Sequence, residues 1–381
     1  MNNFEYCNPT RLVFGKGQIE KLAKLVPLHS RVMITFGGGS VKRNGVYEAV
    51  KMALHEHKCI EFWGIEPNPS VETLRKAVEL GKERQVDFLL AVGGGSVLDG
   101  TKLIAAALAQ PDLDPWDLVL QGRSTTSIPF ACVMTLPATG SEMNCGAVIS
   151  CQKTNEKRSF YSNYPVFSIL DPQVTFSLPL HQIACGLTDI FVHVLEQYLT
   201  TPGQSRPMDR WAEGLLLTIL EIAPKIWNNP HDYNLMSDYM LSATLALNDM
   251  IRMGVTQDWS THMIGHELTA LCGIAHGASL ALVMPGTMRV LRDQKWGKLL
   301  QYAERIWGLT DGDDEDIIDR AIAETEAFFQ SLGLATRLSD AGISDQVIDI
   351  IARRFDEAGV AYGEAKNVNG EMVRKILLNC K

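Results

Sequence analysis

Residues 86–109 read VDFLLAVGGGSVLDGTKLIAAALA, an apolar run that ends in glycines and continues into an alanine-rich stretch. The run at 86–92 has the length and composition of a buried strand, and the stretch after the glycines has the composition of a helix. A strand joined by a glycine-rich turn to a helix is a unit from which parallel sheets are built. This stretch therefore predicts an α/β fold.

Similar units surround this stretch. Further apolar runs occur at 32–36, 59–63 and 128–136, and the first of them also ends in GGGS. Helical patterns follow up to about His55 and again over about 71–85, where Ser70 is the expected N-cap. Apolar strands that alternate with helices indicate a mostly parallel sheet with helices on both faces.

The second half of the chain changes character from about His181, where strand signals fade and helical periodicity takes over. Helices are expected at 181–200, 208–227, 235–253, 259–272, 296–308, 315–331 and 345–358. Prolines between 171 and 179 disfavour helix at the residues before them, which places a boundary there. We therefore predict an α/β domain at 1–178 and an all-helical domain at 179–381.

Composition excludes several classes of protein. The chain has 35 Lys and Arg against 44 Asp and Glu, a net charge of -9, and no basic run, which argues against nucleic acid or an anionic membrane surface as partner. The N-terminus lacks the apolar core of a signal peptide, and no apolar stretch is long enough to span a bilayer. We expect a cytoplasmic protein.

The cysteines and tryptophans carry no functional signal. The eight cysteines are scattered without a C-x-x-C pair, so we expect free thiols and no zinc bound to sulfur. The seven tryptophans, which include Trp211 and Trp259, are expected to pack rather than to line a pocket.

The two GGGS turns indicate a phosphate-binding site. Such a turn lets backbone N–H groups approach a phosphate, and the helix N-terminus adds favourable partial charge. In the second copy, Gly94, Gly95 and Ser96 are placed to cradle a pyrophosphate, and Asp99 lies one turn into the helix. A single turn of this kind is about as often without a ligand as with one, but two such turns on neighbouring strands favour a crevice that binds a ligand. Neither copy matches G-x-G-x-x-G, so an ordinary Rossmann assignment would be wrong in detail.

Other polar residues beside these strands are further candidates for cofactor binding. The segment TLPATGSE at 135–142 follows a strand and offers the hydroxyls of Thr135, Thr139 and Ser141 to a phosphate or a carboxamide. Taken together, we predict that the cofactor contacts Gly37, Gly38, Gly39, Ser40, Asn68, Gly94, Gly95, Ser96, Asp99, Thr135 and Thr139.

The first GGGS turn, at 37–40, follows a strand at the place where the adenosine ribose of a dinucleotide cofactor should lie. An acidic residue there would accept hydrogen bonds from the ribose 2′-OH and would repel the 2′-phosphate of NADPH. The residues of this turn predict a preference for NADPH. Gly39 offers no carboxylate, Ser40 offers a hydroxyl, and Lys42 and Arg43 place positive charge nearby.

Histidines and one aspartate indicate a metal site. Asp189 and His193 are four residues apart, as are His262 and His266, so each pair lies on one face of a helix, and His276 follows. A lone histidine is usually structural, but this cluster suits Zn²⁺ or Fe²⁺. Spacing by itself favours both His262 and His266 as ligands and does not decide which three of the four histidines bind.

Several segments resemble the iron-containing, or group III, alcohol dehydrogenases, in order and over essentially the whole chain. They are TRLVFGKG at 10–17, GGGSVLDGTK at 93–102, TLPATGSE at 135–142, GLTDIFVHVLEQY at 186–198 and THMIGHELTA at 261–270 with the following His276-Gly277. Two more segments, GGGSV at 37–41 and DWSTHMIGHELTA at 258–270, are similar to the butanol-dehydrogenase-like branch, which includes NADPH-dependent aldehyde reductases.

The resemblance implies a Rossmann-like dinucleotide-binding domain followed by an all-helical metal-binding domain, and commonly a dimer. It implies one divalent metal, Fe²⁺ or Zn²⁺, held by Asp189, His193, His262 and His276. It places His266 beside the metal without binding it, and Lys157 near the nicotinamide ribose. The resulting catalytic candidates are His266, Asp99 and Lys157.

The predicted function is hydride transfer between NADP(H) and a small uncharged aldehyde or primary alcohol, mainly as an aldehyde reductase. The alternatives on the same scaffold are a dehydroquinate-synthase-like lyase, a related NAD-dependent polyol dehydrogenase, and a metal- and nucleotide-binding sensor without turnover. A phosphorylated polyhydroxy acid would need Lys and Arg near the ligands, and the segments 186–200 and 258–278 contain neither. That absence favours the small uncharged substrate.

Overall fold

The computed structural model describes residues 1–381 and contains two compact units, each discontinuous in sequence. The first, which we call the sheet unit, comprises Cys7–Leu178 and His231–Thr244. The second, the helical unit, comprises Met1–Tyr6, Pro179–Pro230 and Leu245–Lys381. The division into domains at 1–178 and 179–381 stays a prediction.

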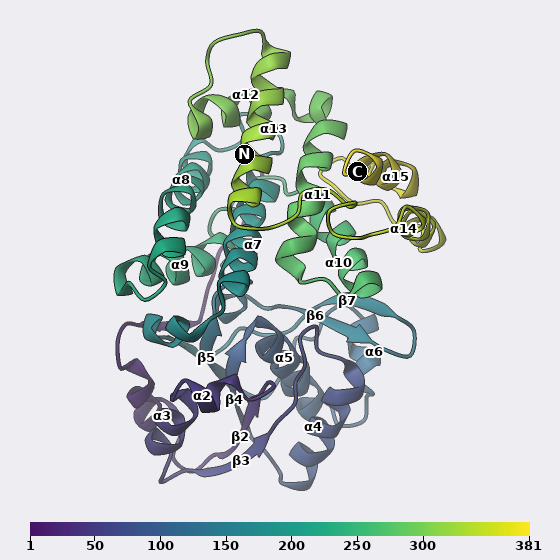
Figure 1. The fold of residues 1–381 in the computed structure, drawn as a ribbon. Coiled ribbons are helices and arrows are strands. Elements are labelled where there is room, and N and C mark those ends of the chain that lie inside the picture. The colour runs from purple at the N-terminus through teal and green to yellow at the C-terminus, as the bar shows by residue number, and fades with distance from the viewer. The chain divides into compact units, whose positions relative to one another are not determined.

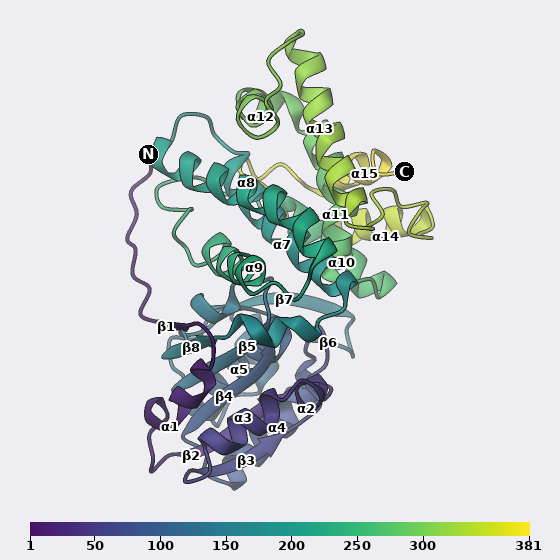
Figure 2. The same ribbon diagram turned by 60° about the vertical axis from the view of Figure 1, so that its left-hand side comes forward.

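A six-stranded parallel sheet forms the centre of the sheet unit, in the order β1-β8-β5-β4-β2-β3. The strands are β1 (Arg11–Phe14), β2 (Arg31–Phe36), β3 (Lys58–Phe62), β4 (Phe88–Gly94), β5 (Phe130–Leu136) and β8 (Phe167–Leu170). Figure 2 shows β1 beside β8 at one edge. The predicted fold class, a parallel α/β unit and a helical unit, is confirmed.

Of the strands that the sequence predicted, β2, β4 and β5 are almost wholly buried, whereas β3 is only partly buried. In β4, Phe88 to Val92 are all buried, so this strand is a continuous apolar run. The sequence did not predict β1 and β8, which have four residues each, or the antiparallel hairpin of β6 (Gly146–Cys151) and β7 (Glu156–Tyr161). Strand β7 is mostly polar and exposed, so it carries no apolar run.

Helices flank the sheet, and α5 contacts both β4 and β5 (Figure 1). The helices of this unit are α1 (Leu22–Leu25), α2 (Ser40–Arg43), α3 (Val46–Ala53), α4 (Val71–Glu83), α5 (Gly95–Ala109), α6 (Pro115–Leu120), most of α9 (Tyr233–Ala246), and the 3-10 segments Gln18–Lys21, Ser141–Met143 and Pro172–Ser177. Ser70 caps α4 as predicted, since its hydroxyl accepts from the backbone N–H of Thr73 at 3.3 Å.

The helical unit is built around α7, which contacts α8 and α11. Its helices are α7 (Leu180–Tyr198), α8 (Arg206–Asn228), α10 (Ser260–Cys272), α11 (His276–Val290), α12 (Arg292–Trp307), α13 (Asp314–Ser331), α14 (Gln346–Glu357) and α15 (Gly370–Leu378). None of the helices in the structure combines the length and hydrophobicity that crossing a membrane requires.

One helical prediction differs from the structure, and two helices of the helical unit were not predicted. The helix expected at 235–253 ends at Ala246, because Asp249 and Gly254 adopt left-handed backbone conformations that break it. Helices α11 and α15 were not predicted. Helix α11 contains Pro285 and Gly286, residues that disfavour helix on their own, yet it is almost wholly buried, so packing overrides their propensity.

Candidate functional site

Three helices of the helical unit supply the candidate metal ligands. Asp189 and His193 lie one turn apart on α7, His262 lies on the first turn of α10, and His276 is the first residue of α11. The side chains of Asp189, His193 and His262 are 4 to 6 % exposed, whereas that of His276 is 23 % exposed. A charged or polar cluster this deeply buried needs partners that compensate its desolvation.

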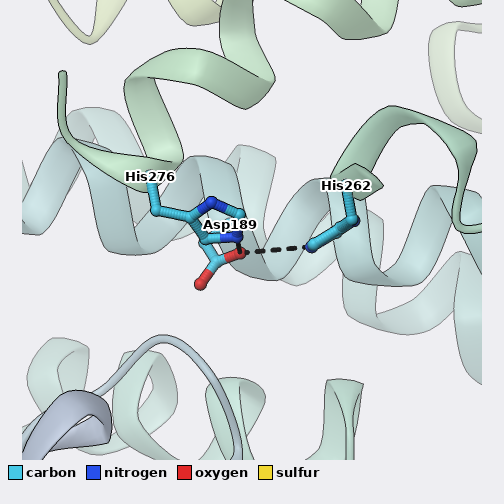
Figure 3. A group of neighbouring side chains, drawn as sticks. All are labelled: Asp189, His262 and His276. Atoms are coloured by element: carbon cyan, nitrogen blue, oxygen red, sulfur yellow. Dashed lines mark ion pairs between the residues drawn. The ribbon is translucent and has the colours of Figure 1, made fainter. Parts of the chain in front are cut away.

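The three histidines converge on one carboxylate oxygen. The Nε2 atoms of His193 and His262 each lie 3.5 Å from Asp189 Oδ1, and Nε2 of His276 lies 3.7 Å from it. Figure 3 shows His262 and His276 approaching this carboxylate from two helices. The rings of His193 and His262 stack, with centroids 4.5 Å apart and planes inclined by 15°.

These distances fit a divalent metal ion. With metal–ligand bonds of about 2.1 Å, neighbouring ligand atoms of a tetrahedral site are about 3.4 Å apart, close to the separations found here. One carboxylate and three imidazoles form the donor set of an Fe²⁺ or Zn²⁺ site. The buried Nε2 of His262 has no hydrogen-bond partner, which a bound cation would supply. Asp189, His262 and His276 by themselves already form a compact ligand group.

Burial and nearby carboxylates set the pKa values of His193 and His262. Burial lowers the pKa of His193 to about 4, so this imidazole is neutral near pH 7, the form that binds metals. For His262, burial lowers the pKa, but the carboxylates of Glu196 and Asp189 outweigh burial and raise the pKa to about 9. Binding a cation at His262 would therefore release a proton.

Glu196 is a site residue to which sequence reasoning gave no role. It lies on α7 and is 2 % exposed. One carboxylate oxygen accepts from the backbone N–H of Thr261 at 2.6 Å, and the other accepts from both the backbone N–H and the ring Nδ1 of His262. A carboxylate that holds the outer nitrogen of a ligating histidine fixes its tautomer and ring orientation. The signal in the sequence is its spacing, seven residues after Asp189 and three after His193.

His266 lies next to the ligand group on α10. Its side chain is buried, and its ring centroid lies 4.9 Å from that of His276 and 6.4 Å from that of His262. The compact group of Asp189, His262 and His276 does not include His266, and it does not include His193 either. That His266 lies beside the metal without binding it stays a prediction.

The second GGGS turn and the segment after β5 come together in the sheet unit. A Cβ on Gly95 would lie 2.5 Å from Thr139 Oγ1, so only glycine allows the two turns to approach this closely. Ser141 Oγ donates to Asp99 Oδ1 at 2.7 Å, and the backbone N–H of Val148 donates to the other oxygen at 2.9 Å. Thr135 lies buried within β5.

Three predicted cofactor residues that are distant in sequence also meet. The Nζ of Lys157 donates to Asn68 Oδ1 at 2.9 Å, and the backbone N–H of Asn68 donates to Ser96 Oγ at 3.3 Å. Lys157 lies on β7, Asn68 in the loop before α4, and Ser96 at the start of α5. The structure thus joins Lys157 to the second GGGS turn.

Lys102 was quoted only as the end of a motif, yet it anchors these turns. It is fully buried and its Nζ donates to Ser141 Oγ at 2.7 Å, Asn144 Oδ1 at 3.0 Å and the carbonyl of Gly146 at 2.6 Å. Burial lowers the pKa of Lys102 and raises that of Asp99, and each group's charge opposes the shift of the other. Lys102 therefore holds Ser141 in position to donate to Asp99.

The first GGGS turn leads from β2 into the short helix α2. Gly39 has a φ of 97°, a left-handed conformation that suits glycine, and Ser40 begins α2. The Nζ of Lys42 lies 4.1 Å from the ring centre of Trp63 and 5.5 Å from that of Tyr47. This cation–π contact fixes the ammonium near the turn. Gly37 and Gly38 lie between β2 and Gly39 and have no side chain to contribute.

Family models match both parts of the chain. The model described as iron-containing alcohol dehydrogenase matches residues 9–172, and the model for the C-terminal part of the same family matches residues 183–380. The chain belongs to the iron-containing alcohol dehydrogenase family. The family predicted from sequence is thereby confirmed, and the lyase alternative is not favoured.

Relatives within this alcohol dehydrogenase family cover the whole chain. The chain is 50 % identical to the NADPH-dependent aldehyde reductase YqhD of Escherichia coli, over 99 % of both proteins. It is 41 % identical to a probable NADH-dependent butanol dehydrogenase of Bacillus subtilis, again over 99 % of both.

Solved structures of family members share the fold. The crystal structure of Escherichia coli YqhD matches with a TM-score of 0.98 and 49 % identity, covering 100 % of this chain and 99 % of that one. An NADH-dependent butanol dehydrogenase A from Thermotoga maritima matches with a TM-score of 0.94 and 35 % identity, with the same coverage. The predicted class of enzyme, an alcohol dehydrogenase or aldehyde reductase, agrees with the names of these relatives.

Proposed function

We propose that this protein reduces small uncharged aldehydes to primary alcohols with NADPH, using a divalent metal ion. The observation that carries the proposal is the convergence of three imidazole Nε2 atoms within 3.7 Å of one buried carboxylate oxygen. The chain is also 50 % identical to an NADPH-dependent aldehyde reductase.

Asp189, His193, His262 and His276 are the proposed ligands of Fe²⁺ or Zn²⁺. When bound, the ion would polarise the aldehyde carbonyl and the nicotinamide would supply the hydride. Glu196 orients His262, and burial keeps His193 neutral and ready to bind a cation.

His266 is the proposed proton donor. The overall reaction consumes an aldehyde, the hydride of NADPH and one proton, and gives an alcohol and NADP⁺. His266 lies beside His276, so its ring would be placed to donate a proton, through a water molecule, to the substrate oxygen. The i, i+4 spacing with His262 favoured His266 as a ligand. The Nε2 atoms of the other three histidines all lie near Asp189 Oδ1, which supports those three as the ligands instead.

The two GGGS turns are the proposed cofactor site. Gly94, Gly95 and Ser96 would cradle the pyrophosphate, and Lys157, held by Asn68, would contact the nicotinamide ribose. Asp99, Thr135 and Thr139 would face the nicotinamide end. Around the first turn, Gly37, Gly38, Gly39 and Ser40 would contact the adenosine ribose, and Lys42 and Arg43 would favour its 2′-phosphate.

The finer biological assignments are also part of the proposal. We propose that the enzyme acts in the cytoplasm, as a homodimer, with a dinucleotide-binding domain at 1–178 and a metal-binding domain at 179–381. Size-exclusion chromatography with light scattering measures the oligomeric state directly.

A cofactor and metal survey tests the proposed activity. Butanal is offered with NADPH and with NADH, oxidation is followed at the nicotinamide absorbance band, and the metal content of the same preparation is measured. We expect turnover that favours NADPH and requires about one Fe²⁺ or Zn²⁺ per chain. A protein that binds metal and NADPH but oxidises no NADPH with any aldehyde would instead be a sensor.

A further inference from the structure

Trp259 has an unusual backbone conformation immediately before α10. Its φ and ψ are 67° and 4°, a left-handed conformation that is unfavourable for a bulky side chain. Such conformations persist only where the surrounding structure imposes them, and they concentrate at functional sites.

Buried contacts on both sides of Trp259 impose this conformation. Asp258 Oδ1 accepts from the backbone N–H of Ser260 at 2.9 Å, and its Oδ2 pairs with Lys295 Nζ at 2.8 Å, with both charged side chains only 2 % exposed. The backbone N–H of Asp258 donates to the carbonyl of Glu196 at 2.8 Å. The strained residue is therefore anchored to α7, the helix that carries Asp189 and His193.

The indole ring lies against two of the proposed metal ligands. Its centroid is 5.3 Å from that of His262 and 6.1 Å from that of His193, with planes inclined by 74° and 65°. The indole N–H donates to Gln257 Oε1 at 2.7 Å, so its hydrogen-bonding capacity is used locally. The ring therefore offers apolar surface beside the ligand imidazoles.

Core packing does not explain this placement. Two aromatic residues in the core of the helical unit, Tyr198 and Tyr302, are at most 2 % exposed and lie on regular helices. Trp259 is only half-buried and sits in a strained turn next to the ligands. The sequence suggested that it packs like any other tryptophan, and the structure gives it a more specific position.

We propose that Trp259 is a wall of the substrate site and selects against aldehydes that are branched at carbon 2. This inference rests on the proposed function. An aldehyde whose carbonyl faces the Asp189 cluster has its first carbons next to the side chains that border the ligands, and Trp259 borders two of them. A rigid apolar ring there favours a linear alkyl chain by contact and opposes a branch at carbon 2 by steric overlap.

The selectivity test compares butanal with 2-methylpropanal in wild type, Trp259→Phe, Trp259→Ala and the control Trp211→Ala. Trp211 is a 45 % exposed tryptophan on α8. We expect Trp259→Ala to lower kcat/KM for butanal about tenfold relative to 2-methylpropanal, the range expected for a lost hydrophobic contact. Trp259→Phe should lie between, and Trp211→Ala should match wild type. If Trp259→Ala does not fold, the direction of the Trp259→Phe change decides.

Two results would overturn the proposal. In the first, the substrate ratio stays constant while the metal content of the Trp259 variants falls, which makes Trp259 a support for the ligand rings only. In the second, the ratio stays constant while KM for NADPH rises, which makes it part of the cofactor site.

A binding measurement separates this inference from the proposed activity. Butyramide, an unreactive analogue of butanal, is titrated into the metal-loaded protein while tryptophan fluorescence is recorded. We expect a fluorescence change in wild type and Trp211→Phe that is absent in Trp259→Phe. An identical fluorescence change in all three proteins would contradict the proposal that Trp259 borders the substrate site. The fluorescence change does not depend on turnover. If the protein reduced no aldehyde, the proposed function would be refuted, but the titration would still test whether Trp259 borders the substrate site.

Discussion

Glu196 and His262 are bonded at two points, because the same carboxylate oxygen accepts from the backbone N–H of His262 and from its ring Nδ1. The other oxygen holds the N–H of Thr261, so one side chain of α7 fixes both the start of α10 and the orientation of a proposed ligand on it. The geometry of the proposed metal centre would therefore depend on a residue that is not itself a proposed ligand.

Replacing Glu196 by glutamine should weaken metal binding about 10- to 100-fold, because an amide has a single acceptor oxygen and no charge to hold the ring of His262. Competition with a chelator measures the affinity. The matched control is Glu267→Gln, since Glu267 lies on α10, the helix that carries His262, and pairs with Arg354 at 2.8 Å. Equal affinities in the two variants would show that Glu196 does not position the site.

Gly277 follows His276 directly, and a Cβ on it would collide with the backbone of Cys185 on α7. Because backbone atoms cannot swing aside, Gly277→Ala should displace the start of α11, cost about 1 to 3 kcal/mol of stability and weaken metal binding. Thermal unfolding and chelator competition measure the two effects. Gly214→Ala is the control, because Gly214 is exposed on α8 with no atom near its Cβ, and it should be neutral or slightly stabilising. A Gly277→Ala variant as stable as that control would refute the close packing.

Lys42→Glu should weaken the preference for NADPH. The substitution replaces the ammonium over Trp63 by a carboxylate that repels a 2′-phosphate, and we expect kcat/KM for NADPH to fall about tenfold, roughly 1.4 kcal/mol, with little change for NADH. Gly39→Asp is a less clean test, because the φ of 97° strains any side chain there. Lys24→Glu, which makes the same charge change at an exposed position on α1, is the control. A parallel loss for both cofactors would contradict the assignment of Lys42.

Stability should fall in acid partly through Asp258. Burial raises the pKa of Asp258, but Lys295 outweighs burial, with further help from Ser260, and holds the pKa below its usual range. A carboxyl group whose pKa is lowered by folding stabilises the folded protein fully at a pH above its pKa in the unfolded chain, about 3.9 for aspartate. This stabilisation is lost as the pH falls from there through the pKa in the folded protein. Lys295 and Glu364 are the charged groups that face it.

Asp258→Asn should therefore be about 1 to 3 kcal/mol less stable than wild type at pH 7, because Lys295 then keeps only Glu364 as a charged partner. Its thermal midpoint should also fall less steeply between pH 4 and pH 3. Unfolding scans at several pH values test both points. Parallel curves for the two proteins would show that Asp258 does not contribute to the acid transition.

The sequence predicted those elements whose local pattern agrees with their packing. Strand β4 and helix α5 are examples, because the strand is uniformly apolar and the helix is rich in alanine. Helix α11 escaped prediction because Pro285 and Gly286 oppose it locally and only burial against other helices stabilises it.

The same contrast holds for the site. The i, i+4 spacing of Asp189 and His193 follows from helix geometry, so sequence alone placed them together. The sequence did not predict a role for Glu196 or Lys102, because the role of a buried carboxylate or lysine depends on partners that are distant in sequence. Glu196 and its partner His262 are 66 residues apart. No local pattern joins Lys157 to Asn68, which are 89 residues apart.

The central claim is that Asp189, His193, His262 and His276 bind the metal ion that the reduction requires, while His266 beside them does not bind it. The most direct measurement determines metal content and NADPH-dependent butanal reduction in the same preparations of wild type, His262→Ala, His266→Ala and His276→Ala. We predict that the variants at His262 and His276 lose both metal and activity, and that His266→Ala keeps its metal but turns over about 10²-fold more slowly. Full turnover in a metal-free preparation, or equal loss of metal at His266 and His262, would contradict the account.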